Sequence, residues 1–116
     1  MSKADIRKLT ADAKVEFKTK TYDYNGTTVV FKQPSQGQRE EIIELSTKED
    51  GRLSPVDFNI WAVIELTYDE EGNKVFGKAD YDSFRNKPSG GFIEEFAEQA
   101  LELMGNSKMK EEEKES

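Results

Sequence analysis

Near the N-terminal end, apolar or β-branched residues alternate with charged ones. Between residues 15 and 21 every second position is charged, with Val15 and Phe17 on the apolar side. This period of two predicts a half-buried strand. Asn25-Gly26 follows, and this dipeptide accepts the positive φ angles of a type I′ turn, while residues 27–31 supply a second β-prone run. The sequence therefore predicts a β-hairpin closed at Asn25-Gly26.

Two serine residues mark the starts of helices in the middle of the chain. Ser35 is a favourable N-cap for a helix that runs to about Thr47. Ser54 precedes Pro55, a residue whose missing N–H costs nothing at the first helical position. Residues 58–66 contain only two clearly polar positions. We expect this second helix to lie centrally, with few of its faces in water.

The C-terminal part of the chain predicts one short and one longer helix. Asp80 is a candidate N-cap for a helix to about residue 86, and residues 88–91 break it. From residue 92 to 104 apolar residues recur at spacings of three and four, with glutamates on the opposite face. Gly105 is well placed to end that helix in the left-handed conformation.

At the N-terminus, Ser2 can cap a short helix in which Ile6 and Leu9 recur at helical spacing. We therefore divide the chain into an N-terminal helical or flexible segment (1–14), a single α+β domain (15–105) and a disordered charged tail (106–116). The predicted fold class is α+β and mainly α-helical, with an N-terminal β-hairpin followed by a small bundle of about four helices.

Composition narrows the classes of function. The 116 residues carry a net charge of −7, with 34% hydrophobic and 35% charged residues. A phosphate backbone requires a concentrated basic surface, so we expect no nucleic-acid partner. Cysteine and histidine are both absent, which removes thiolate nucleophiles, the commonest metal ligand and the usual general base. We expect a protein that is not an enzyme and that needs no cofactor or metal.

The N-terminal residues lack the apolar core of a secretory signal, and no apolar run approaches the roughly 20 residues that cross a bilayer. We therefore expect no membrane partner and a cytoplasmic location.

Two loops invite a ligand-binding interpretation. The acidic stretch from Asp69 to Asp80 suggests calcium, but an EF-hand needs glycine at its sixth position and glutamate at its twelfth, where this chain has Lys74 and Asp80. Residues 87–91 precede a helix and could present N–H groups to a phosphate, but they lack the residue order of a nucleotide-binding loop. A plain turn is favoured for the first loop, and a flexible hinge between helices for the second.

Apolar residues in the two longest predicted helices are candidates for protein binding. Tryptophan is enriched at binding hot spots, although packing in the core is the preferred explanation for Trp61. The apolar stripe of the last helix is wider than a small fold requires, so part of it could meet another subunit. The candidate residues are Trp61, Phe92, Ile93, Phe96, Leu101 and Met104.

The order of these elements resembles that of the tail assembly chaperones of siphophages, the long-tailed bacteriophages. The stretch 66–81, with acidic residues, a glycine, a short apolar return ending in Phe76 and an Asp80-capped helix, is similar to a passage in that family. The strand that ends at Pro34 and enters a helix at Ser35 is similar to an earlier one. The likeness covers residues 15–105, whereas residues 1–14 have no counterpart in it.

The resemblance implies binding to the tape measure protein, which the chaperone keeps soluble in the cytoplasm of the bacterial host while the tail tube polymerises. It also implies self-association into open oligomers, with the tail tube protein as a further partner. Two alternatives stay open at this point. One is a structural minor tail or head-tail completion protein that remains in the phage particle, and the other is a small host regulatory adaptor.

Overall fold

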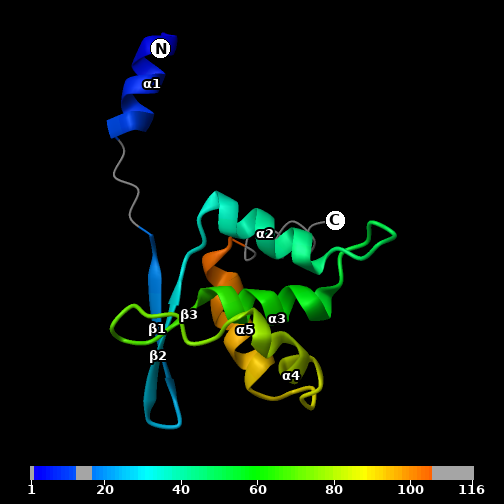
Figure 1. Cartoon of the computed structure of the whole chain (residues 1–116). Helices are drawn as coiled ribbons and strands as arrows, with labels where there is room; N and C mark the ends of the chain where they lie inside the picture. The colour runs from blue at the N-terminus through cyan, green and yellow to red at the C-terminus, as the bar shows by residue number, and fades with distance from the viewer. Residues whose placement is uncertain (1, 13–16, 106–116) are drawn as a thin grey trace, which may run out of the picture.

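The computed structural model describes residues 2–12 and 17–105. A β-hairpin is followed by four α-helices, which confirms the predicted mainly helical α+β fold (Figure 1). The helices and strands are α1 (Lys3–Asp12), β1 (Thr19–Tyr24), β2 (Thr27–Lys32), α2 (Gln36–Ser46), α3 (Pro55–Leu66), β3 (Thr67–Tyr68), the 3-10 helix η1 (Lys78–Asp80), α4 (Tyr81–Arg85) and α5 (Phe92–Leu103).

The hairpin closes where the sequence predicts. Asn25 and Gly26 have φ angles of 51° and 84°, as the two central positions of a type I′ turn require. Tyr24 pairs with Thr27 across this turn in an antiparallel register. A third strand, β3, was not predicted; it pairs antiparallel with β2 and gives the sheet order β1-β2-β3. A strand of two residues is too short to leave a periodic signal in a sequence.

The predicted face of β1 is wrong. Thr19, Thr21 and Asp23 are exposed, whereas Tyr22 and Tyr24 on the other face are partly buried against the core. The two tyrosines bury more apolar surface than threonines can, so they determine which face turns inward. Phe17 lies before the strand and is 43% exposed, and Val15 lies outside the described residues.

The predicted starts of α2 and α3 are confirmed. The Ser35 hydroxyl accepts a hydrogen bond from the backbone N–H of Gln38 at 3.1 Å, and the Gln38 side chain accepts one from the Ser35 N–H at 3.1 Å. This reciprocal pair is a capping box. At α3 the Ser54 hydroxyl accepts from the Asp57 N–H at 3.2 Å, with Pro55 at the first helical position.

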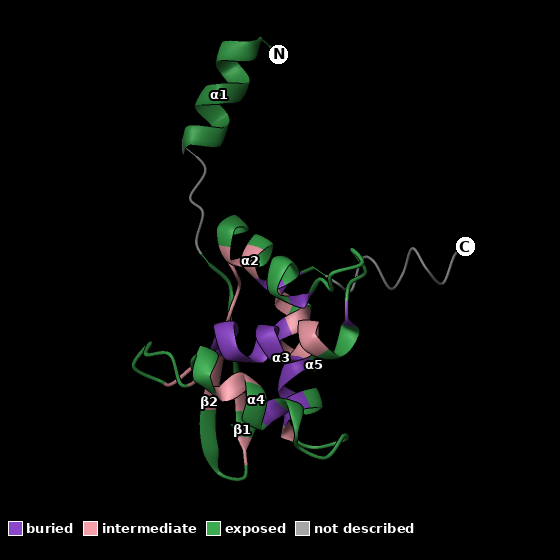
Figure 2. Cartoon of the chain, turned by 45° about the vertical axis from the view of Figure 1, so that its right-hand side comes forward, coloured by how far each residue is buried: buried purple, intermediate pink, exposed green. Residues whose placement is uncertain are grey.

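Helix α3 is the central element of the fold. It packs against α2 on one side and against α5 on the other, and α5 also packs on β1 and β2 (Figure 1). Every residue from 60 to 66 is buried (Figure 2). The central position that the apolar run predicts for this helix is therefore confirmed.

A chain of aromatic rings connects the hairpin to α5 and α4. Phe96 lies edge-on to Tyr24, Phe31 and Phe92, with ring centroids 5.1 to 5.4 Å apart. Phe92 in turn contacts Phe84 at 5.4 Å. Edge-to-face pairs of this kind add to the stabilisation from buried area. Phe96 therefore joins the sheet to the helical layer.

A hydrogen bond and an ion pair hold α5 to the hairpin beside these aromatic rings. The Tyr22 hydroxyl donates a hydrogen bond to Glu95, and Lys20 forms an ion pair with Glu102. The hydrogen bond to Glu95 is the main cause that raises the pKa of Tyr22 to about 12. Glu95 and Glu102 of α5 thus connect this helix to the hairpin.

Of two further predicted helix ends, the structure confirms one and contradicts the other. Gly105 has a φ of +82° and ends α5 in the left-handed conformation, as predicted. Asp80 does not cap α4, because its own backbone is helical and it belongs to η1. Its carboxylate instead accepts from the Gly77 N–H at 2.9 Å.

Helix α1 stands apart from the other elements (Figure 1). Its predicted N-cap is present, since the Ser2 hydroxyl accepts from the Asp5 N–H at 3.2 Å. Residues 2–11 are all exposed (Figure 2). The predicted tail (106–116) lies outside the described residues. Across the ranges that are described, none of the helices combines the length and the apolar character needed to traverse a bilayer.

Candidate functional site

The candidate binding residues lie mainly in the core. Trp61, Ile93, Phe96 and Met104 are each less than 10% exposed, and Phe92 and Leu101 pack against the core while partly exposed. In this conformation the first four offer a partner little surface. Their role in protein binding stays a prediction. If the apolar stripe of α5 contacts another protein, Phe92 and Leu101 would make that contact.

Trp61 is held in the core by a partner ring. Its indole stacks on Tyr81 with centroids 4.8 Å apart and an angle of 6° between planes. The Tyr81 hydroxyl donates to the Asp57 carboxylate at 2.6 Å, and Arg85 donates to the same oxygen at 2.7 Å. Burial, followed by the bond to Asp57, raises the pKa of Tyr81. This network fixes α4 against the start of α3.

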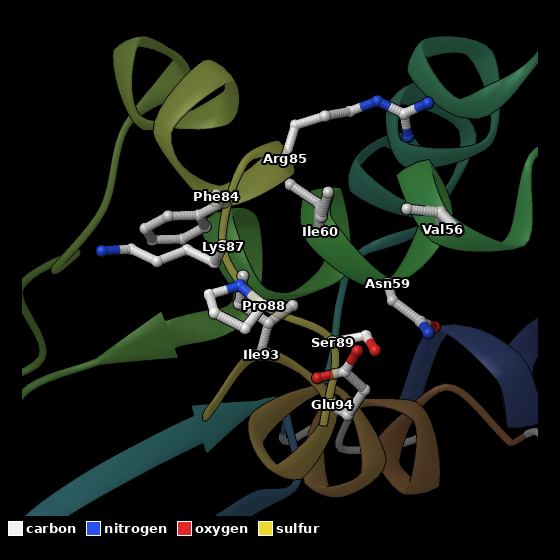
Figure 3. A pocket seen from close by; sticks show the side chains of 10 residues that line it. All are labelled: Val56, Asn59, Ile60, Phe84, Arg85, Lys87, Pro88, Ser89, Ile93 and Glu94. Carbon is white, nitrogen blue, oxygen red and sulfur yellow. The ribbon is translucent and has the colours of Figure 1, made fainter. Parts of the chain in front are cut away.

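Beside this network the surface has a small hollow with an apolar floor, here called the α3–α4 hollow. It has a volume of about 190 Å³ and lies between α3, the segment after α4 and the start of α5 (Figure 3). Ile60, Phe84 and Ile93 supply buried apolar surface, and Val56 is 56% exposed at its edge. The other lining residues are Asn59, Arg85, Lys87, Pro88, Ser89 and Glu94.

The segment after α4 explains why this hollow exists. Pro88 cannot continue the helix, and Gly90 takes a φ of +81°, which favours glycine. The chain then turns so that α5 begins at Phe92 and places Ile93 in the floor of the hollow. Sequence reasoning identified the break at residues 88–91 as a hinge, but it missed the hollow that this break forms with Val56.

The chemistry of the hollow suits a side chain from another protein. Its floor is apolar, and its charged lining residues are Lys87, Glu94 and Arg85, of which Arg85 is already paired with Asp57. Lys87 is therefore the cation that the hollow offers to a partner. Its volume is below the roughly 300 Å³ at which small-molecule pockets begin. An apolar side chain flanked by a carboxylate would match this lining.

The acidic loop considered for calcium has a structural role. The Asp69 carboxylate accepts from the backbone N–H groups of Glu71 and Asn73, each at 2.9 Å. The bond from Asn73 is the first cause that lowers the pKa of Asp69. These bonds close a turn that returns the chain to β3, where Tyr68 bridges to Lys74. Within residues 2–12 and 17–105, no group of three potential ligands is placed to hold a metal ion.

The fold is similar to that of a solved structure. The structure of the bacteriophage HK97 tail assembly chaperone matches it with a TM-score of 0.55 and 22% sequence identity. The match covers 85% of this chain and 97% of that one. No protein-family model matches the sequence, and a search of curated proteins gives no match either. The resemblance to siphophage tail assembly chaperones is therefore confirmed at the level of the fold.

Proposed function

Starting from this shared fold, we propose that the protein is a phage tail assembly chaperone that acts in the cytoplasm of the bacterial host. It binds the tape measure protein and keeps it soluble while the tail tube polymerises. The observation that carries the proposal is the structural match to the HK97 chaperone over 85% of the chain. The proposed activity is binding alone, with no catalytic step.

The α3–α4 hollow supports the proposal by offering a contact suited to a helical partner. A helix on this surface can place one apolar side chain over Ile60 and Phe84, with an acidic neighbour near Lys87. A shallow contact of this kind is weak by itself. When many copies bind along one extended partner, their binding free energies accumulate and the overall avidity rises. Open self-association of the chaperone would place the copies in such a row.

Co-expression tests the proposal directly. In a tail gene cluster we expect a very long reading frame immediately downstream, encoding the tape measure protein. That product should be more soluble when expressed with this chain and should be recovered with it in a pull-down. The assignment fails if the wild-type chain neither binds the product nor raises its soluble fraction.

A matched pair of variants tests the hollow itself. Val56→Glu places a charge at its edge and should reduce the recovered partner about tenfold, because an unpaired charge is costly to desolvate in an apolar contact. Val75→Glu is the control, because Val75 is a similarly exposed valine, 49% against 56%, in the loop after β3. Equal binding by both variants would remove the hollow from the contact and leave the chaperone function standing.

Purified phage particles test the alternative function. A chaperone should be absent from the finished tail, whereas a structural minor tail or completion protein stays in it. Detection of this chain in virions at a fixed copy number would favour the structural alternative.

A further inference from the structure

Helix α1 carries an apolar face that covers nothing in its own chain. Ile6 and Leu9 are 51% and 55% exposed, although they lie one turn apart on the same side of the helix. Lys3 and Arg7, four residues apart, follow along one edge of that face. An amphipathic helix normally buries such a face against another element.

The outer face of α2 has a complementary pattern. Its inner side is buried through Ile42 and Ser46, whereas Ile43 on the outer side is 39% exposed. Ile43 lies in an open hollow of about 370 Å³ that is lined by residues of α2 alone. Glu40 and Glu44, again four residues apart, form one edge of it. Among the ion pairs of the described residues, none involves either glutamate.

We propose that α1 of one copy docks on the outer face of α2 of a second copy. Ile6 and Leu9 would lie over the open hollow of α2 that contains Ile43, and the basic edge of α1 would meet the acidic edge of α2. This assignment rests on the self-association included in the proposed function and specifies its interface. The same chain does not supply the cover, because its own α1 stands away from α2 with its side chains exposed (Figure 2).

The order of residues fixes the direction of the docked helix. A right-handed helix turns by about 100° per residue. Rotating in that direction from the apolar residues leads to Lys3 and Arg7 on α1, and to Glu40 and Glu44 on α2. The charged edge therefore lies on the same side of the apolar face in both helices. Two such faces bring their charged edges together only when the helices are antiparallel. Lys3 then lies opposite Glu44, and Arg7 lies opposite Glu40.

This interface is heterologous, since the donor surface (α1) and the acceptor surface (α2) are different parts of the chain. Each copy that donates α1 still offers its own α2 to a third copy. A contact of this kind produces rings or open filaments and has no natural stop at a dimer. It therefore provides the repeated arrangement that binding along an extended partner requires.

Charge reversal in the full chain tests the pairing. The variant with Lys3→Glu and Arg7→Glu should associate about tenfold more weakly than wild type in sedimentation velocity at low salt. Glu40→Lys with Glu44→Lys should do the same. The chain that carries all four changes should recover most of the association. Failure of the fourfold variant to recover, while both doubles are folded by circular dichroism, would overturn the antiparallel pairing.

A mixing experiment identifies the second copy as the occupant. Leu9→Glu spoils the donor and Ile43→Glu spoils the acceptor, so each variant alone should be monomeric. An equimolar mixture should form a one-to-one pair that grows no further, because only one intact interface can form. The control, Val75→Glu, should associate like wild type.

Three results would reject the assignment. Wild-type chain that stays monomeric at high concentration would overturn it, as would unchanged association of Leu9→Glu. A mixture that shows no pair, despite an associating wild type, would also reject it, because the intact α1 of one variant would then not bind the intact α2 of the other. The pull-down of the tape measure protein is scored with the wild-type chain. A wild type that recovers this partner, while Leu9→Glu associates like wild type, would reject this interface and leave the proposed function standing.

Discussion

The carboxylate of Glu65, on the buried helix α3, accepts a hydrogen bond from the Lys74 ammonium group at 2.9 Å. Glu65 is only 6% exposed, and Lys74, in the loop after β3, is the residue that forms an ion pair with it. Lys74→Met should destabilise the fold by about 1 to 3 kcal/mol, because it leaves a buried charged acceptor without its partner. Urea denaturation measures the change.

The double variant Glu65→Leu with Lys74→Met is the control for this pair. Removing both charges replaces the pair with apolar groups, which is often nearly neutral. A stability close to that of wild type would confirm that the cost of the single variant comes from the stranded carboxylate. A double variant as unstable as the single one would contradict this explanation.

Trp61→Ala should cost about 3 to 5 kcal/mol of stability, because it removes a buried indole and its stacking on Tyr81. The denaturation midpoint should fall without loss of two-state behaviour. Tyr81→Phe is a milder companion that keeps the ring and removes the bond to Asp57. An unchanged midpoint in Trp61→Ala would place this residue outside the core.

Stability should decrease on acidification as the Asp69 carboxylate takes up a proton. The folded-state pKa of this group is lowered, chiefly by the N–H of Asn73. Its contribution is therefore complete above the unfolded-state pKa of about 4 and is lost as pH falls through the lower folded-state value. Asp69→Asn should show a shallower fall of melting temperature between about pH 5 and pH 3. An identical profile would rule out this carboxylate as a source of the acid sensitivity.

Local signals in the sequence predicted the helix caps and turns well. Ser35, Ser54, the Asn25-Gly26 turn and Gly105 act through neighbours within a few residues, so their effect is encoded in the sequence at that place. The fold class followed from the order of these signals.

Features that depend on distant parts of the chain were harder to predict. The inward face of β1 is set by the contact of Tyr24 with Phe96, which is far away in the sequence. The same holds for α5, whose stripe is wide because it covers both the sheet and α3. The α3–α4 hollow is lined by Val56 from α3 and Ile93 from α5, and no local pattern in the sequence indicates that these two residues line one hollow.

The arrangement of the sheet affects how readily strands from different chains can pair into an aggregate. Among the described strands, β1 is at one edge of the order β1-β2-β3 and leaves a row of backbone groups that another strand could extend. Lys18 and Asp23 place exposed charges along that edge, where they oppose the pairing of strands from different chains. The proposed assembly through α1 and α2 would therefore not compete with pairing of β1 edges from different chains.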